Sequence, residues 1–318
     1  MPETIFIRML GNGGQVRESY QDLYHMIELS GYKTCLLNEV DFQSDNTYIC
    51  TFKDGLAEST FSSKEAKERK CRVILWQLEW AEWRNGVLEF PAWEHNEFNV
   101  LWMFDWCDEI WVSDLYFFEM IRRFNPRSRD KTRFIVLGGH PDFGKKDDVE
   151  YEPLYDFCHY MYLTGPRGHK FQILQDIGFK MAPNCWGKDR EHGLLHSRWG
   201  LNLHQNPFPV ITPQRFMLFA SYKLPIVTDY CANPFPFKVF QDGLIHWDPR
   251  KSSVMNKELR DEAVEHNYRV VTHWFSFRKE VDRRINNPVG QSGIQSLIDT
   301  SYPIASLFDE NGKLFYGH

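Results

Sequence analysis

Short runs of apolar residues alternate along the chain with segments whose apolar residues recur every three or four positions. In the first half the apolar runs lie at 4–10, 33–40, 47–52, 72–80, 109–114 and 133–137, and the helical pattern lies at 16–30 and 115–124. Short apolar runs predict buried strands, whereas a spacing of three to four predicts amphipathic helices. Strands that alternate with helices form parallel sheets. The pattern therefore predicts an α/β fold.

The second half repeats this alternation after a charged, strand-poor segment at 145–152. Strands are expected at 157–165, 179–187, 200–204, 225–229 and 243–247, and helices at 170–178, from Pro213 onward, and at 256–285 with a break near His273. The sequence thus predicts two Rossmann-like, doubly wound domains that face a central cleft, the common location of a small-molecule site. We expect domains at 1–150 and 151–275, followed by a C-terminal helix and tail at 276–318.

The segment 199–230 holds the strongest helix start in the chain. Thr212 suits the N-cap position, and Pro213 suits the first helical position, which needs no N–H partner. Gln214 and Arg215 then fall in the first turn. Free N–H groups and the positive helix end attract an anion such as phosphate, and Arg215 would add a bidentate cation. On the residues alone, an ordinary βα unit whose arginine pairs with a carboxylate explains the pattern equally well.

A second basic pair, Arg167 and Lys170, occupies the expected turn GPRGHK between the strand at 157–165 and the helix at 170–178. This is the second place where a helix start could bind a phosphate, although solvated charge explains the pair as well. Because both places follow strands of one predicted sheet, they point to the same ligand.

Composition narrows the class of protein. The chain has 318 residues, of which 42% are hydrophobic and 25% charged, as expected for a folded, soluble protein. The net charge of −6 argues against a surface that wraps nucleic acid, but not against a local basic cleft. The seven cysteines show no metal-ligand spacing, so no metal site is expected, and the sequence shows no signal peptide or membrane-spanning run. A cytoplasmic location is the simplest interpretation.

Several side chains near strand ends are candidates for proton transfer. The segment WQLEW places Glu79, followed by Glu82, between tryptophans, where burial would raise a carboxyl pKa, as a general base or acid needs. His140 and Asp142 follow the strand at 133–137 in the same way. Surface glutamates beside core tryptophans remain the alternative. The turn GNGG after the first strand is not the dinucleotide pattern, so no nicotinamide cofactor is expected.

The order of these motifs resembles that of a family. A glycine-rich first turn, WQLEW, DEIWVSD, VLGGHP, GPRGHK, GLNLHQN and TPQRFMLFASYKLPIVTD follow one another. This order is similar to that of GT-B glycosyltransferases, close to the bacterial and phage proteins with a CgeB-like C-terminal domain. The resemblance is diffuse and covers most of residues 1–285. It implies a hexosyl- or pentosyltransferase that uses a nucleotide sugar, most simply a UDP-sugar, and needs no other cofactor.

The resemblance also implies roles for particular residues. Arg167 and Lys170 would approach the donor diphosphate, and the helix around 274–285 would cross back to the first domain. The nucleotide-sugar pocket would be lined by Asn12, Gly13, Gly14, His204, Gln205, Thr212, Gln214 and Arg215. Many relatives carry a ribose-binding glutamate where this chain has Leu218, and often glycine where it has Lys223. The ribose contact is therefore expected from Asp229 or Gln214.

Several functions fit these observations. The first is sugar transfer to a small molecule, glycan or protein. The second is transfer to modified bases of DNA, as in phage enzymes, for which the basic stretch 122–133 would bind phosphates. The third is a non-catalytic binding subunit of the same fold, suggested by Leu218, and an epimerase of this fold is a fourth.

Overall fold

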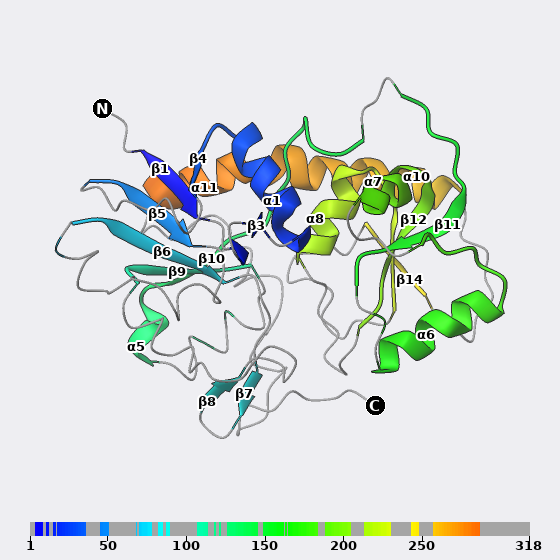
Figure 1. Ribbon diagram of the computed structural model, residues 1–318, viewed down its shortest axis with the longest axis horizontal. Coiled ribbons are helices and arrows are strands. Elements are labelled where there is room, and N and C mark those ends of the chain that lie inside the picture. Colours follow the sequence, from blue (N-terminus) through cyan, green and yellow to red (C-terminus); the bar gives the residue numbers. More distant parts are fainter. Residues whose placement is uncertain are drawn as a thin grey trace. The chain divides into compact units, whose positions relative to one another are not determined.

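The computed structural model describes residues 4–8, 11–12, 15–16, 18–35, 45–50, 68, 70–77, 82–84, 87–89, 107–113, 118, 121, 126–145, 149–161, 163, 165–183, 188–204, 213–229, 243–247 and 257–286. The chain forms two compact units, Met1–Leu137 and Gly138–His318. Each unit is an α/β structure built on a parallel sheet (Figure 1). The predicted fold class, with two Rossmann-like domains, is confirmed.

The first unit contains a parallel sheet with the strand order β10-β9-β6-β5-β1-β4. Its strands are β1 (Ile5–Arg8), β4 (Lys33–Cys35), β5 (Thr47–Cys50), β6 (Arg72–Gln77), β9 (Glu109–Val112) and β10 (Thr132–Phe134). Helix α1 (Glu18–Leu29) joins β1 to β4, and α5 (Pro126–Arg129) precedes β10. Two small antiparallel pairs are β2 (Gly11–Asn12) with β3 (Gln15–Val16), and β7 (Glu82–Arg84) with β8 (Val87–Glu89).

Two of the tryptophans are core residues of the first unit. Trp76 of β6 and Trp111 of β9 are buried and meet edge to face, with ring centroids 5.7 Å apart. Each indole N–H has a partner, since Trp76 donates to Ser113 and Trp111 donates to Glu109. Glu109 also forms an ion pair with Arg72. Buried indoles need such acceptors, so these residues stabilise the sheet rather than stack on a ligand.

The second unit contains a parallel sheet with the order β11-β12-β13-β14. Its strands are β11 (Tyr155–His159), β12 (Ser197–Asn202), β13 (Ile226–Thr228) and β14 (Leu244–His246), and its first helices are α6 (Gly165–Asp176), α7 (Lys188–Leu195) and α8 (Pro213–Ser221). A parallel bridge joins Met181 to Phe157 of β11. Phe157 also pairs with Trp199 of β12, so β11 lies between the segment around Met181 and β12.

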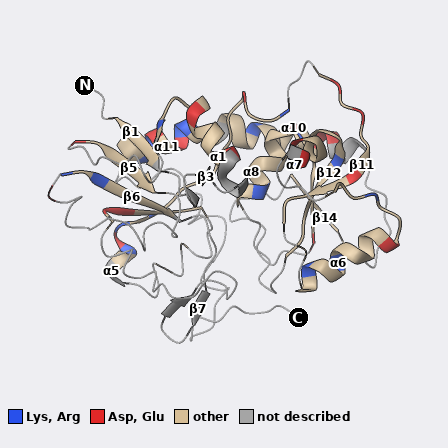
Figure 2. Ribbon diagram, viewed as in Figure 1, with Lys and Arg blue, Asp and Glu red and all other residues tan. Residues whose placement is uncertain are grey.

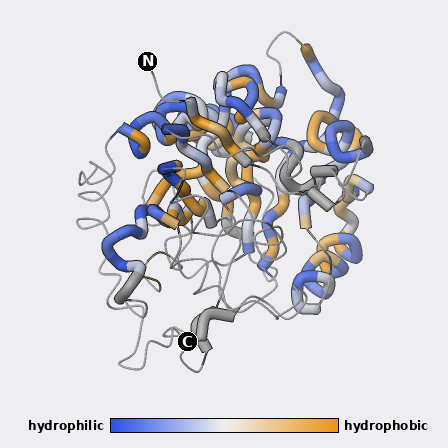
Figure 3. Tube along the Cα trace, turned by 60° about the vertical axis from the view of Figure 1, so that its left-hand side comes forward, coloured by the Kyte–Doolittle hydropathy of each residue, from blue (hydrophilic) through white to orange (hydrophobic). Residues whose placement is uncertain are grey.

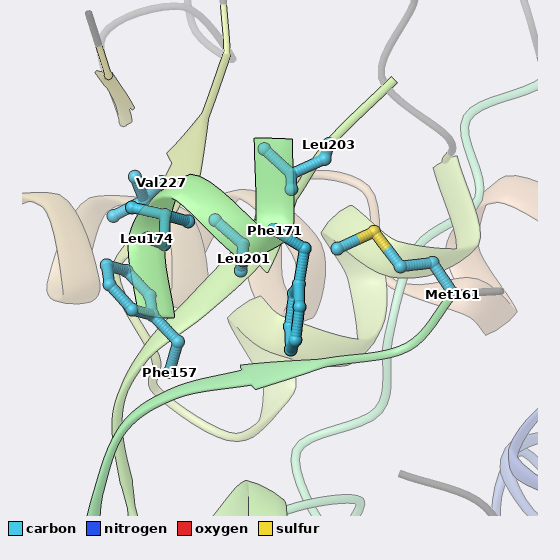
Figure 4. Packing of buried hydrophobic residues seen from close by; sticks show 7 residues of the cluster. All are labelled: Phe157, Met161, Phe171, Leu174, Leu201, Leu203 and Val227. Atoms are coloured by element: carbon cyan, nitrogen blue, oxygen red, sulfur yellow. The ribbon is translucent and has the colours of Figure 1, made fainter. Parts of the chain in front are cut away.

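Helices α6 and α8 cover opposite faces of this second sheet. Phe171 and Leu174 of α6 pack in one cluster with Leu201 of β12 and its neighbours (Figure 4). A Cβ on the preceding residue, Gly200, would lie 2.5 Å from the ring of Phe219 in α8. Successive residues of a strand face opposite sides, so α6 and α8 approach from different sides. Hydrophobic stretches alternate with hydrophilic ones along the Cα trace (Figure 3).

The helical region near the C-terminal end of the second unit consists of α10 (Lys257–Arg269), a π-helical turn η2 (Val270–Trp274) and α11 (Phe277–Asn286). The predicted break near His273 is thus confirmed. The glycines that follow β10 pack here, with Gly139 N–H donating to Val271 O at 2.8 Å and Phe277 N–H donating to Gly139 O at 2.9 Å. A Cβ at Gly138 would collide with the backbone carbonyl of Phe275, which explains glycine there.

Several sequence expectations differ from the structure. The described part of the expected strand at 179–187 holds a single bridge at Met181, and β12 begins at Ser197, before the expected segment 200–204. The segment GPRGHK was predicted to be a turn, but α6 already begins at Gly165, so it forms the first turns of the helix. Helix α7 was not predicted, because its residues KDREHGLL show little hydrophobic periodicity. Val16 belongs to β3, and α1 begins only at Glu18. Every described helix is too short or too polar to cross a membrane.

Lys223, at the C-terminal end of α8, adopts a backbone conformation that favours glycine. Lys223 has a φ of +54°, its N–H bonds to Ala220 O, and the Leu224 N–H bonds to Phe219 O, as in a Schellman cap. The left-handed conformation costs a non-glycine residue about 1–2 kcal/mol. The Lys223 ammonium lies 4.4 Å from the ring centroid of Tyr268, a contact worth about 0.5–1 kcal/mol.

Lys223→Gly is therefore expected to raise the free energy of unfolding by about 1 kcal/mol or less, since the relieved backbone strain exceeds the lost ring contact. Urea unfolding measures the change. In a Tyr268→Leu background, where no ring contact can be lost, the gain should be larger. A loss of stability in that background would show that the left-handed backbone at this cap carries no strain.

Candidate functional site

The carboxyl ends of β11, β12 and β13 carry the candidate site of the second unit. Chain order reverses at β11, because the segment around Met181 pairs with one side of this strand and β12 with the other. In open parallel sheets, ligands bind outside the carboxyl ends of the strands at such a reversal. The strands end here at His159, Asn202 and Thr228. Helices α6 and α8 follow β11 and β12, so both begin at this same edge of the sheet.

Asp229, directly after β13, is the centre of the site. Its carboxylate accepts a hydrogen bond from the Lys170 ammonium at 2.5 Å and another from His204 Nδ1. The backbone N–H of His204 also points to both carboxylate oxygens, at 3.3 Å each. Asp229 and His204 are buried, whereas the side chain of Lys170 is about a third exposed. Lys170 is thus held at the boundary between the protein interior and solvent.

Asn202, the last residue of β12, continues this network toward α8. Its Oδ1 accepts a hydrogen bond from Arg215 Nη1 at 2.7 Å. Its Nδ2 lies 3.3 Å from His204 Nε2 and donates to Thr228 Oγ1 at 3.1 Å. Arg215, in the first turn of α8, is therefore connected through Asn202 to the Asp229 centre.

A third cation, Arg167, lies in the first turn of α6. Its Nε donates to the backbone carbonyl of Leu203 at 2.9 Å, and its side chain is buried. Burial lowers the pKa of this guanidinium to about 10, partly offset by the charge of Asp229, so it is cationic at neutral pH. Basic residues accordingly lie at the N-terminal ends of both α6 and α8 (Figure 2). An anion is the ligand that two helix starts with three cations bind best.

The ionisable groups of the site show how its charge is balanced. Burial opposes ionisation of Asp229, but the hydrogen bond from His204 and then the hydrogen bond and charge of Lys170 outweigh it, so the pKa of Asp229 is lowered. Burial lowers the pKa of His159 from 6.5 to about 4, against a backbone hydrogen bond at Met161, and the nearby Arg215 lowers it further. At neutral pH the site thus holds a carboxylate, a neutral His159 and the cations of α6 and α8.

The structure brings together several residues that the sequence predicted for donor binding. Arg167, Lys170, His204, Arg215 and Asp229 belong to one hydrogen-bonded neighbourhood, and Gln214 lies beside Arg215 in the first turn of α8. Gln205 and Thr212 lie outside the described residues, as do Gly13 and Gly14. Asn12 is in β2, but its side chain is outside the described part of the chain.

The predicted proton-transfer residues stand apart from this network. His140 Nδ1 accepts a hydrogen bond from the Asp142 N–H at 3.1 Å, and the Asp142 carboxylate is exposed. The loop that carries His140 and Asp142 packs against Ser221 at the C-terminal end of α8. A Cβ added to Gly139 or to Gly144 of this loop would contact Ser221. Arg215 lies in the first turn of the same helix. Glu79 lies outside the described residues, and Glu82 is in β7, with its side chain likewise undescribed.

Sequence reasoning missed Asn202, Thr228 and His159. A signal was nevertheless present, because each is a polar residue within or at the end of a short apolar run. Polar side chains at the carboxyl ends of buried strands need hydrogen-bond partners. Asn202 and Thr228 bond to each other, and Asn202 also accepts from Arg215 at the start of α8.

Comparisons with known proteins identify the fold of this chain. Neither a protein-family model nor a curated protein matches the sequence. The structure is similar to a glycosyltransferase from Rickettsia africae, with a TM-score of 0.56 and 9% identity over 91% of this chain and 99% of that one. It is also similar to HepE of Anabaena in complex with UDP-glucose, with a TM-score of 0.55 and 7% identity over 89% and 99% of the two chains.

These likenesses establish the fold. The chain is built as two doubly wound units and aligns with nearly the full length of both solved structures. It therefore has the GT-B glycosyltransferase fold, as its sequence motifs predicted. HepE was also solved with UDP, and that complex gives a TM-score of 0.55 at 7% identity over 90% of this chain and 99% of that one.

Proposed function

We propose that this protein transfers a sugar from a nucleotide-sugar donor, most simply a UDP-sugar, to an acceptor hydroxyl. The observation that carries the proposal is the convergence of Arg167, Lys170 and Arg215 at the strand-order reversal of the second sheet. A diphosphate carries the negative charge that this site complements. HepE, which has the same fold, was solved with UDP-glucose and with UDP, and this supports the choice of donor.

The cations have a chemical role in this reaction. When the bond between sugar and nucleotide breaks, negative charge develops on the leaving diphosphate. Fixed cations and helix N-termini stabilise that charge in the transition state more than in the ground state, which accelerates the step. Lys170 and Arg215 are placed for this role because each is already oriented by a hydrogen bond, to Asp229 and to Asn202 respectively.

The nucleotide ribose needs a contact other than the glutamate of relatives. Leu218, at that position, is fully buried in α8. The Asp229 carboxylate is engaged by His204 and Lys170, which leaves Gln214 as the better of the two predicted ribose contacts. Gln214 is half-buried in the first turn of α8, beside Arg215.

The base that deprotonates the acceptor is proposed to be Glu79, His140 or Asp142. His140 accepts a hydrogen bond at Nδ1, and in a neutral imidazole this places the proton on Nε2. In that state His140 donates from Nε2 instead of accepting a proton there. Glu79 is therefore the first residue to replace. Full transfer activity in Glu79→Gln would exclude this role.

The acceptor is proposed to be a small molecule, glycan or protein. In the basic stretch 122–133, the Lys131 ammonium donates to Cys107 O at 2.8 Å, and Arg133 donates to Thr132 O at 3.1 Å. These bonds give the described part of the stretch a structural role. Hydroxymethylated DNA accordingly serves as one acceptor to test rather than as a second proposed function.

Thermal unfolding with UDP, GDP, ADP and their sugar conjugates tests the proposal. A ligand at a hundred times its Kd stabilises the protein by about 2.7 kcal/mol, which shifts the unfolding temperature by several degrees. We expect one diphosphate series to stabilise the protein, while its free nucleoside at the same concentration does not. If no diphosphate stabilises it, the donor assignment is wrong. Donor binding without hydrolysis or transfer would instead indicate a binding subunit.

A further inference from the structure

The two half-exposed cations of the site come from opposite faces of the second sheet. Lys170 belongs to α6 and Arg215 to α8, and these helices pack on opposite sides of β12. One chain of hydrogen bonds nevertheless joins them. It runs from Lys170 through Asp229, His204 and Asn202 to Arg215.

Every hydrogen bond of this chain has a single possible direction. Arginine only donates, so the Asn202 atom that faces Arg215 must be the amide oxygen. The Asn202 amide nitrogen therefore faces His204 and donates to Nε2, which must be the unprotonated ring nitrogen. The proton of the neutral imidazole then lies on Nδ1, where the Asp229 carboxylate accepts it.

We propose that Asn202, His204 and Asp229 form a positioning relay that holds the Lys170 ammonium and the Arg215 guanidinium for one diphosphate without touching it. All three relay side chains are buried, whereas the two cations at its ends are partly exposed. The inference rests on the proposed function for the nature of the ligand. The relay itself is defined by contacts within the second unit.

A physical benefit follows from this arrangement. A free lysine or arginine side chain loses rotamer entropy when it is fixed on a ligand. The relay fixes both cations before the ligand arrives, and such preorganisation strengthens binding. A change in the middle of the relay should therefore weaken diphosphate binding, even where it removes no charge.

Asn202→Leu is the direct test, because it keeps the size and the formal charge of the site but removes the acceptor of Arg215. We expect the affinity for inorganic pyrophosphate and for UDP, measured by titration calorimetry, to fall about tenfold. Asn267→Leu is the matched control. Asn267 is a buried asparagine of the same unit whose amide donates to Gly243 O at 2.8 Å, outside the relay. The Asn267→Leu protein should lose as much stability as the Asn202→Leu protein but keep its affinity for pyrophosphate and for UDP.

A double-mutant cycle separates positioning from a general structural role. In an Arg215→Met background, Asn202→Leu should have little further effect on pyrophosphate affinity, because the side chain that it orients is gone. A full tenfold loss in that background would overturn the proposal. So would equal losses of affinity in Asn202→Leu and Asn267→Leu.

Nitrogen NMR of the unmodified protein tests the relay without any variant. The shifts of His204 should show a protonated Nδ1 and an unprotonated Nε2, and the opposite tautomer or a doubly protonated ring would overturn the relay. Pyrophosphate binding distinguishes this proposal from the proposed function. If pyrophosphate binds but no nucleotide sugar does, the transferase assignment fails and the relay stands. If neither pyrophosphate nor UDP binds, the relay has no such role.

Discussion

Replacement of Arg215 by methionine is expected to lower the rate of donor turnover about 10²–10³-fold, the loss typical of one preorganised donor to developing charge. Arg215 is held by Asn202 Oδ1 at 2.7 Å in the first turn of α8, so its charge adds to that of the helix N-terminus. Methionine keeps much of the side-chain volume and removes only the cation. The measurement is steady-state release of UDP from the UDP-sugar that stabilises the protein most.

A lysine at position 215 refines this expectation. Arg215→Lys keeps the charge but loses the planar fork that can bind Asn202 and a phosphate together. We expect its turnover to lie between those of the wild type and Arg215→Met. Arg198→Met is the control, because Arg198 is an exposed arginine of β12 in the same unit. If Arg215→Met turned over the donor as fast as Arg198→Met does, the site would not stabilise the leaving diphosphate.

The strands of both sheets were predictable because each is a short apolar run bounded by polar residues. The strands β6, β9 and β13 fall within their predicted segments, whereas β12 begins at Ser197, before its predicted segment 200–204. The helix start at Pro213 was predicted correctly from Thr212 and Pro213. Helix α6 shows what pattern reading overlooks. Gly165, with a φ of +54°, and Pro166 form its start, so glycine and proline mark a helix start here and not a turn.

The cations of the site could be predicted, but their partners could not. Basic residues at the starts of α6 and α8 are visible in the sequence and suggest an anion. The connection between them depends on Asn202, the last residue of β12, and Asp229, the residue after β13, which are 27 positions apart in the chain. Only the parallel register of β12 and β13, which pairs Asn202 with Thr228, brings these side chains together. Asp229 was accordingly predicted, as an alternative to Gln214, to bind the ribose, whereas its carboxylate is engaged by Lys170 and His204.

Acid is expected to destabilise the protein through His159, at the end of β11. Burial lowers the pKa of His159 from 6.5 to about 4, so between these values the unfolded chain binds a proton that the folded chain does not. Stability therefore falls as the pH decreases from 6.5 to 4, and this one group accounts for a loss of about 3 kcal/mol. Urea unfolding at a series of pH values measures the slope.

His159→Phe should remove this part of the slope, because phenylalanine does not titrate and can keep the edge contact with Phe171, whose ring centroid lies 4.8 Å from that of His159. His25→Phe, at an exposed position of α1, is the control for loss of an imidazole. Arg215 also lowers the His159 pKa, so Arg215→Met should raise that pKa and make the fall between pH 6.5 and 4 smaller. An unchanged slope in His159→Phe would assign the acid sensitivity to other groups, whereas a smaller slope in Arg215→Met would show that the cation of the proposed diphosphate site acts on the end of β11.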